Sequence, residues 1–312
     1  MTPLSKCLLF PIDGTEEALR PIEFLQRLYP DLNQVGIVLC YFAPALPPAY
    51  REQRGSPEQL KKKQEFMKSR EQGTRLAFDQ AKKALVRVGF QSDLIQEHVL
   101  EKQVSKAKDA CLLADWKKAD AVLVRKQVTS TLAGIFDDDP TDDLLRHCFT
   151  SPLWLVEGTV DVSHAAICIT NEDASLRAAD HAAFMLTGTG AEVTLLHAAK
   201  TISHPLSTPV THITAEVEKW LMTPEGRPVR PFLNQAHDIL KREGIGDERV
   251  RITVIPSQGK AASEIPAFCQ KERIGIVVLG HTQPTGIKGF LKGSVTKKII
   301  AELKNMAVWV NQ

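Results

Sequence analysis

The chain has 312 residues, about twice the length of a typical single domain, so we expect two domains. Its net charge of +2 is nearly neutral, and basic residues are interspersed with acidic ones, which argues against a nucleic-acid-binding surface. No apolar stretch approaches the roughly 20 residues that a membrane span needs. The N-terminal apolar run is too short for a signal peptide, so we expect a cytoplasmic protein.

The six cysteines are scattered along the chain. They form no CxxC pair and have no histidine at a spacing typical of a zinc site. Some lie in apolar, strand-like runs, which is typical of buried thiols. We therefore expect all of them to be reduced: Cys7, Cys40, Cys111, Cys148, Cys168 and Cys269.

The first half alternates short apolar runs with helical patterns. The runs suit strands buried on both faces and lie at 6–12, 35–42, 92–99, 121–124 and 153–156. Helical patterns occupy 15–28, 57–88, 102–118 and 141–148. In the second of these helices, the run Lys61–Lys63 indicates a solvated face, not a binding patch. This alternation predicts a parallel sheet with right-handed crossovers.

The second half repeats the scheme. Its predicted strands are 165–170, 192–197, 250–255, 276–279 and 307–310. Its predicted helices are 175–186, 213–222, 231–243, 261–271 and one that begins at Ser294. Residues 201–211 contain Pro205, Pro209 and several hydroxyl side chains, which predicts a loop.

The two halves can be aligned at an offset of about 155–158 residues. FPIDGTEEALRP matches CITNEDASLRAA, AVLVRKQ matches IVVLGHT, and SPLWLVEG matches NMAVWVNQ. An internal duplication follows, with domains 1–157 and 158–312 forming an internal pseudo-dimer. The predicted fold class is α/β, with two tandem doubly wound domains. Each is predicted to be a five-stranded parallel sheet of order 3-2-1-4-5 flanked by helices.

Residues 277–296, VVLGHTQPTGIKGFLKGSVT, combine an apolar strand, a loop rich in glycine and lysine, and a helix start. This order is typical of phosphate sites, because the N–H groups and the dipole of a helix N-terminus favour an anion. Glycines such as Gly280 and Gly293 permit close backbone approach. Lys288 and Lys292 add positive charge, although they also suit a solvated loop, and Ser294 also suits a helix cap.

These residues resemble the universal stress protein family. The run from Ile12 to Glu16, followed by Ala18-Leu19-Arg20, is similar to the signature that ends the first strand of that family. Gly280, followed by Gly293-Ser294-Val295-Thr296 at the family spacing, is similar to its G-x2-G-x9-G-[ST] loop. The resemblance covers the chain twice and implies a tandem universal stress protein.

The loop and the resemblance together imply a site for ATP, ADP or AMP in the second domain, and leave Mg²⁺ open. Two positions depart from the family pattern. Thr170 replaces the Asp that contacts the adenine end, and Gln283 replaces the second loop glycine, which predicts weaker binding. The expected site residues are Thr170, Ala198, Leu279, Gly280, Gln283, Lys288, Gly293, Ser294, Val295 and Thr296.

The first domain has the Asp and lacks the loop. Arg125 stands where Gly280 does, and the glycine-serine turn is replaced by Asp137-Asp138-Asp139-Pro140-Thr141. Three carboxylates at a helix N-terminus repel an anion. We therefore expect no ATP binding of the family type in this domain, and expect Asp13-Gly14 to form a turn between strand and helix.

Four aromatic side chains near the ends of predicted strands each suit more than one role. His281 suits either a ligand contact or an exposed loop, and His197 suits a structural hydrogen bond at its strand edge. Trp154 and Trp309 hold matching places in the final strands, which favours a contact between domains or in a homodimer over a ligand stack.

The leading hypothesis is a non-enzymatic stress-response or regulatory protein that binds one adenine nucleotide. An interaction protein with both sites inactive and a slow ATPase remain as alternatives. Walker A, G-x-G-x-x-G and G-x-S-x-G motifs are absent. The loop offers no obvious general base, and only Glu172 and Asp173 could pair on Mg²⁺.

Overall fold

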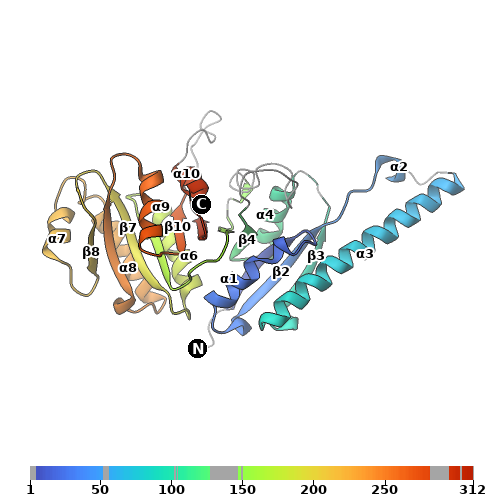
Figure 1. Ribbon diagram of the computed structural model, residues 1–312, viewed down its shortest axis with the longest axis horizontal. Helices are drawn as coiled ribbons and strands as arrows, with labels where there is room; N and C mark the ends of the chain where they lie inside the picture. The colour runs from blue at the N-terminus through green and yellow to red at the C-terminus, as the bar shows by residue number, and fades with distance from the viewer. Residues whose placement is uncertain are drawn as a thin grey trace. The chain divides into compact units, whose positions relative to one another are not determined.

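The computed structural model describes residues 5–51, 56–101, 103, 105–126, 147–148, 150–281, 295–302 and 304–311. The chain forms two compact units, residues 1–26 with 31–151 and residues 27–30 with 152–312 (Figure 1). Both are α/β, as the alternation of strand and helix patterns predicted. No helix in the described part of the chain is both long and apolar enough to cross a membrane.

The first unit contains parallel strands in the order β3-β2-β1-β4. They are β1 (Lys6–Ile12), β2 (Val35–Phe42), β3 (Ile95–Leu100) and β4 (Ala121–Arg125). The helical elements are η1 (Glu17–Leu19), α1 (Pro21–Leu28), η2 (Leu32–Gln34), α2 (Pro48–Arg51), α3 (Pro57–Val88), η3 (Ser92–Leu94) and α4 (Lys106–Lys117). Right-handed crossovers put α1 and α3 on one face of this sheet and α4 on the other.

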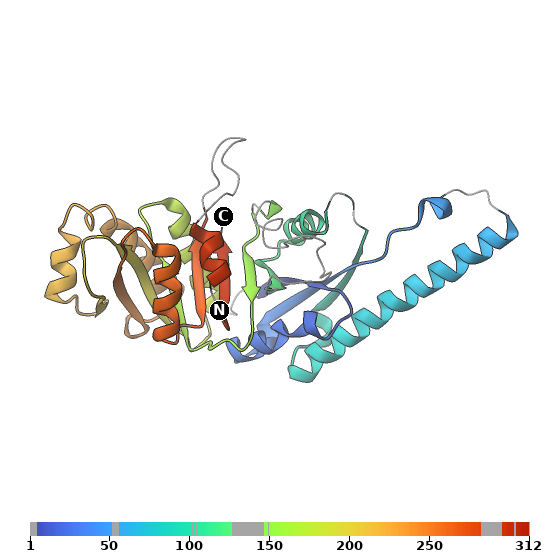
Figure 2. The ribbon, with the colours of Figure 1, turned by 45° about the horizontal axis from the view of Figure 1, so that its top comes forward.

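Helix α3 is 32 residues long and has strong signals at both ends. Ser56 and Gln59 form a capping box at its start, and Gly89 ends it with a φ of 113°. Its buried residues, Ala77, Phe78, Ala81 and Leu85, all lie in the C-terminal half. The N-terminal half extends beyond the sheet of this unit (Figures 1 and 2). Lys61 and Lys62 on that half are exposed, as expected of a solvated face.

The second unit has the predicted strand order 3-2-1-4-5, here β9-β7-β6-β10-β11. The strands are β5 (Leu153–Val156), β6 (His164–Cys168), β7 (Glu192–Ala199), β8 (Leu206–Pro209), β9 (Val250–Pro256), β10 (Ile276–Gly280) and β11 (Ala307–Asn311). The helical elements are α6 (Asp173–Leu186), α7 (Ala215–Leu221), α8 (Arg230–Arg242), η4 (Asp247–Arg249), α9 (Ala261–Lys271) and α10 (Val295–Glu302). By the same crossover rule, α6 and α8 share one face, and α9 and α10 share the other.

Strand β8 corrects the prediction of a loop over residues 201–211. It pairs antiparallel with β9 and adds an edge strand to the sheet. Leu206 and Thr208 are buried while Ser207 and Pro209 are exposed, which is the alternation of a strand with one face on the core. The flanking prolines concealed this pattern, although an edge strand tolerates proline because one row of its N–H groups needs no partner.

The last strands of the two sequence repeats, β5 and β11, pair antiparallel within the second unit. Trp154 and Trp309 face each other in this ladder, and their rings stack with centroids 3.8 Å apart. The Trp154 indole Nε1–H donates to Nε2 of His181 on α6 over 2.9 Å. Burial lowers the pKa of His181 to about 3, so its ring is a neutral acceptor. The two tryptophans therefore stack on each other and join the last strands of the two repeats.

Cys111 and Cys148 form a disulfide, which corrects the prediction that all six cysteines are reduced. Cys111 lies on α4, and the bond spans 37 residues of sequence. Ser151 Oγ donates to Asp115 of the same helix over 2.8 Å, and Thr150 Oγ1 donates to the same carboxylate. These contacts hold Cys148, Thr150 and Ser151 against α4. The predicted helix at 141–148 lies outside the described residues except for His147 and Cys148.

We expect alkylation of the denatured, unreduced protein to modify four thiols, those of Cys7, Cys40, Cys168 and Cys269. Prior reduction should raise the number to the full six. Intact mass spectrometry before and after reduction checks this. Alkylation of all six without a reductant would show that the disulfide is absent.

Candidate functional site

The sheet ladders show which residues of the two repeats occupy equivalent places. In the first unit Leu8 pairs with Ala121 across β1 and β4. In the second unit Ala165 pairs with Ile276 across β6 and β10. Ala121 and Ile276 also begin the matching segments AVLVRKQ and IVVLGHT. The two ladders therefore have the same register.

Counting forward along these strands identifies the residues at their carboxyl ends. Thr170 occupies the place of Asp13, and Gly280 occupies the place of Arg125. Both pairs lie at the edge of the sheet where open α/β folds bind ligands. The equivalence of Thr170 with Asp13 thus rests on strand pairing as well as on sequence.

Gly280 permits a close approach between β10 and the first turn of α6. A Cβ atom built on Gly280 would lie 2.4 Å from the carbonyl carbon and oxygen of Ala174 and 2.7 Å from the backbone nitrogen of Ser175. No side chain fits at such distances. The glycine is therefore required by the packing of α6 whether or not a ligand is bound.

The equivalent place in the first repeat is occupied by a charged side chain. Arg125 Nη1 lies 2.7 Å from Glu17 Oε2, and Glu17 also pairs with Arg20 at 2.6 Å. Here the chain after β1 forms the 3-10 turn η1 before α1 begins, whereas α6 begins at Asp173 as a regular helix. Because the chain after β1 begins with a 3-10 turn and not with an α-helix, the Arg125 side chain has room at the end of β4.

Asp13 is engaged in its own turn, as the sequence predicted. Its Oδ1 accepts the backbone N–H of Thr15 over 2.8 Å and the Thr15 hydroxyl over 2.6 Å. Gly14 follows with a φ of 84°, the left-handed region that glycine adopts without strain. The carboxylate therefore stabilises the turn between β1 and η1.

His281 joins the end of β10 to the start of α10. Its backbone N–H donates to the Asn311 carbonyl over 2.7 Å, and its Nδ1 lies 3.4 Å from the Thr296 hydroxyl. The side chain is only 8% exposed, which corrects the alternative of an exposed loop histidine. The contact brings the N-terminus of α10 to the carboxyl end of β10.

The positive charge near the start of α10 is that of Lys297, because His281 is neutral. Burial and then repulsion from Lys297 lower the pKa of His281. Lys297, in the first turn of α10, is a site candidate that sequence reasoning did not single out. Its signal was the Lys297-Lys298 pair directly after GSVT.

The other described site residues surround the same edge of the sheet. Thr170 is exposed, and its carbonyl accepts the Ser175 hydroxyl over 3.0 Å. Ala198 is half-buried and pairs with Ile255 of β9, and Leu279 is buried in β10. Val295 is the first residue of α10. Gln283, Lys288, Lys292, Gly293 and Ser294 lie outside the described residues, as do Asp137–Thr141 of the first repeat.

The segment after β7 is held by a residue that the sequence did not reveal. Glu225 accepts the backbone N–H groups of Lys200 over 2.7 Å and Thr201 over 3.0 Å. His197 is structural, as predicted, because its Nδ1–H donates to the Ile169 carbonyl over 2.8 Å. Its ring also contacts Trp220 of α7, with centroids 5.4 Å apart. No periodicity or motif links Glu225 to the strand end that it stabilises.

The sequence profile of the universal stress protein family matches residues 5–156 and again 163–310. The chain belongs to the universal stress protein family. It carries two copies of the family domain, and the doubly wound fold agrees with that assignment. Among curated proteins, none matches the sequence.

Solved structures share the fold along the whole chain. A universal stress protein from Archaeoglobus fulgidus is 12% identical with a TM-score of 0.62, covering 99% of this chain and 98% of its own. A functionally unknown protein from Pseudomonas aeruginosa is 14% identical with a TM-score of 0.55, covering 98% of this chain and 92% of its own. At these identities the likeness establishes the fold alone.

The two repeats allow a matched test of the packing at the fourth strand. We expect Gly280→Ala to lower the free energy of unfolding by about 1–3 kcal/mol, because the methyl group forces the first turn of α6 away from β10. Arg125→Ala in the equivalent place should cost less than about 1 kcal/mol, because it removes only a partly exposed ion pair. Urea unfolding of both variants measures the difference. An equal or larger loss for Arg125→Ala would contradict this assignment.

Proposed function

We propose that the protein is a non-enzymatic, nucleotide-sensing member of its family that binds one adenine nucleotide in the second domain, residues 158–312. ATP, ADP and AMP share the adenine, ribose and α-phosphate that this site would contact. The regulatory role in a stress response follows the family. The nucleotide site rests on the geometry at the ends of β6, β7 and β10.

The contact between His281 and Thr296, 3.4 Å long, carries the proposal. It holds the N-terminus of α10 at the carboxyl end of β10, where Gly280 has no side chain. The free N–H groups of a helix start and its dipole favour a phosphate at such a place. Gly293, Ser294, Val295 and Thr296 would supply those N–H groups and hydroxyls, with Lys288 adding charge.

The base would lie against the neighbouring strand ends. The backbones of Ala198 and Leu279 would flank the adenine, and Thr170 would replace the carboxylate of other members by a hydroxyl. A hydroxyl forms a weaker hydrogen bond to a ligand than an ionised group does. We therefore propose an affinity below that of members that keep the Asp, with Gln283 adding a side chain near the phosphates.

The first domain would bind no nucleotide. Arg125 and Glu17 form an ion pair at the end of β4, and Asp13 is bonded to Thr15. A nucleotide would have to break both arrangements, and in sequence Asp137–Asp139 replace the glycine-serine turn of the second repeat. The proposed stoichiometry is therefore one nucleotide per chain, and its occupancy would bias the loop from 281 to 292.

Catalysis forms no part of the proposal. Among the described residues no group of three or more His, Cys, Asp or Glu side chains is placed to hold a metal ion. His281 is buried and bonded on both its backbone and its ring. Phosphate release from ATP that disappears with Gly293→Asp would favour the slow ATPase instead.

We expect isothermal titration with ATP, ADP and AMP to give one site per chain. We also expect a thermal shift equivalent to about 2.7 kcal/mol when the nucleotide is at 100 times its Kd. Gly293→Asp should abolish binding, because a carboxylate at the start of α10 repels phosphate. Gly190→Asp is the matched control. Gly190 lies before β7 at the opposite edge of the sheet, and a Cβ atom there meets nothing within 4 Å.

Two outcomes would contradict the proposal. Two sites per chain would mean that the first domain also binds. No heat and no thermal shift with any of the three nucleotides would favour the alternative hypothesis, an interaction protein with both sites inactive. The replacement of the family Asp by Thr170 favours that alternative.

A further inference from the structure

The two repeats differ at the outer edge of their sheets. In the second unit, β8 covers the outer side of β9 as an antiparallel strand. In the first unit β3 is the outer strand, and in the part of the chain that the structure describes no strand pairs with its free side. An uncovered edge strand presents N–H and C=O groups that can pair with another chain. The second unit shows how this fold covers such an edge.

The ladders show that β3 and β9 occupy equivalent places. Ile95 follows η3 and pairs with Ile37 of β2, and Val250 follows η4 and pairs with Val193 of β7. β2 and β7 are in turn the neighbours of the matched strands β1 and β6. The Val250 carbonyl accepts the N–H of Val210, directly after β8, over 3.2 Å. Val250 and every second residue after it therefore face β8.

Glu97 and Val99 of β3 direct their backbone groups to the free edge. They hold the places that face β8 in the equivalent strand. The Leu100 carbonyl accepts the N–H of Ala43 over 3.0 Å, so Leu100 faces β2 and its neighbour Val99 faces outward. Each of the two outward residues can donate one hydrogen bond to an antiparallel strand and accept another from it.

The side chains on the α4 side of this edge are apolar and exposed. Trp116 of α4 is 71% exposed, and Leu112, one helical turn earlier, is 55% exposed. The Trp116 ring meets the His98 ring edge-on, with centroids 6.0 Å apart. Burial and then repulsion from Lys117 lower the pKa of His98, so its ring is neutral. An apolar side chain opposite His98 would cover Trp116 and remove its ring from water.

Lys117 gives this apolar surface a positive end. Its Nζ donates to the side-chain oxygen of Gln96 over 3.3 Å and lies 4.5 Å from the Trp116 ring centroid. Within the described residues Lys117 forms no ion pair. Gln96 and His98 point to the same face of the strand, so a side chain opposite Gln96 would lie beside Lys117. A carboxylate fits this place because it would pair with the lysine.

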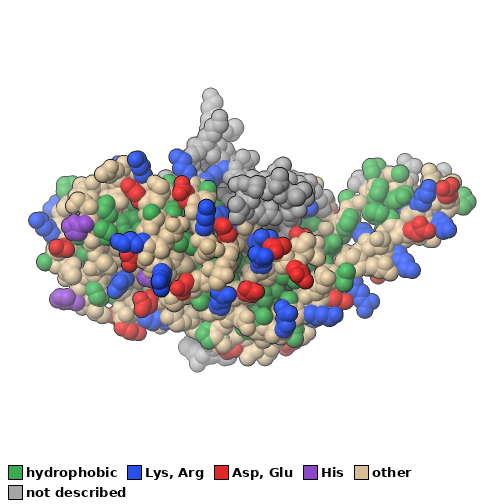
Figure 3. Space-filling view, viewed as in Figure 1, with side chains coloured by type: hydrophobic (Ala, Val, Ile, Leu, Met, Phe, Trp, Pro, Cys, Tyr) green, Lys and Arg blue, Asp and Glu red, His purple; other side chains and the backbone are tan. Residues whose placement is uncertain are grey.

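The α3 side of the edge offers an apolar contact and no unpaired charge. Val99 is 51% exposed, and Glu97 lies 3.7 Å from Lys82 of α3. A nucleic acid or an anionic membrane needs a surface of one sign. On the face of the molecule seen in Figure 3, basic and acidic side chains are interspersed. The edge therefore favours a polypeptide as its occupant.

We propose that the outer edge of β3 binds an extended segment of a partner protein as an antiparallel strand. The segment carries an apolar residue opposite Val99 and an aromatic or large aliphatic residue opposite His98. Two positions later it carries a carboxylate opposite Gln96. Backbone hydrogen bonds to Glu97 and Val99 provide affinity, and the contacts with Trp116 and Lys117 provide specificity. This inference does not depend on nucleotide binding.

A labelled peptide tests the proposal on the full chain. The probe is fluorescein-Ser-Thr-Val-Phe-Thr-Glu-Ser-amide, whose Val, Phe and Glu are placed to lie opposite Val99, His98 and Gln96. We expect fluorescence anisotropy to show saturable binding by about 0.5 mM protein. Trp116→Ala should weaken binding about tenfold, because the Phe ring loses its partner. Leu76→Ala is the matched control, since Leu76 is 58% exposed on α3, and it should leave binding unchanged.

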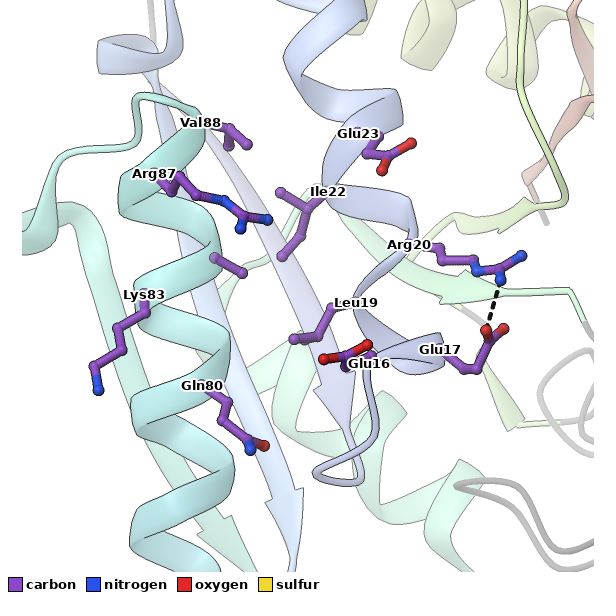
Figure 4. Close-up of a pocket in the computed structure, with 11 residues that line it drawn as sticks. Glu16, Glu17, Leu19, Arg20, Ile22, Glu23, Gln80, Lys83, Arg87 and Val88 are labelled. Atoms are coloured by element: carbon purple, nitrogen blue, oxygen red, sulfur yellow. Dashed lines mark hydrogen bonds and ion pairs between the residues drawn. The ribbon is translucent and has the colours of Figure 1, made fainter.

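A charge exchange provides the decisive arm. Lys117→Glu should weaken binding of the probe about fivefold or more, because two carboxylates then face each other. A second peptide with Lys in place of Glu should reverse the preference and bind the Lys117→Glu chain more tightly than the wild type. Lys83→Glu is the control. Lys83 lines the cavity between α3 and α1 (Figure 4), and the same charge change there should affect neither peptide.

N-methylated peptides test the strand register with the wild-type chain. A methyl group on the backbone nitrogen of the central Thr removes the N–H directed at Glu97, so binding should be lost. A methyl group on the Phe nitrogen, which points away from β3, should leave binding intact.

Four outcomes would overturn the proposal. They are no saturable binding, equal effects of the two N-methyl groups, and no reversal of preference with Lys117→Glu. The fourth is a dimer that Trp116→Ala dissociates in sedimentation equilibrium, because a second copy of the chain would then occupy the edge.

Discussion

No side chain can occupy the end of β10 while α6 begins where it does, because the Ala174 carbonyl group would lie 2.4 Å from a Cβ atom on Gly280. The first repeat avoids this constraint by beginning its first helical segment as the 3-10 turn η1, and the space gained holds the Arg125–Glu17 ion pair. One position at the end of the fourth strand thus separates the repeats. It carries no side chain in the second repeat and an ion-paired arginine in the first.

The residue after Gly280 connects the end of β10 to two neighbouring elements. His281 is bonded to Asn311 of β11 through its backbone and approaches Thr296 of α10 through its ring. The start of α10 is thereby tied to two neighbouring strands. β11 is in turn fixed by its ladder with β5, where the stacked tryptophans lie. The proposed phosphate site is therefore supported by the same strand pairing that joins the last strands of the two sequence repeats.

The sequence predicted the fold well because buried parallel strands and amphipathic helices have distinct periods. It predicted the equivalence of Thr170 with Asp13 and of Gly280 with Arg125 through the repeat. It missed β8, whose four residues are bounded by prolines, and the Cys111–Cys148 bond, whose partners lie 37 residues apart with no motif between them. It also missed Glu225, because a side chain that satisfies distant backbone N–H groups leaves no periodic signal.

The central claim is that a nucleotide binds the second repeat and not the first. Photolabelling with 8-azido-ATP, followed by peptide mapping, tests it most directly because the reactive group lies on the base. We expect label on peptides that contain Thr170, Ala198 or Leu279, and loss of that label with excess ATP. Label on peptides around Asp13 or Arg125, competed by ATP in the same way, would contradict the claim.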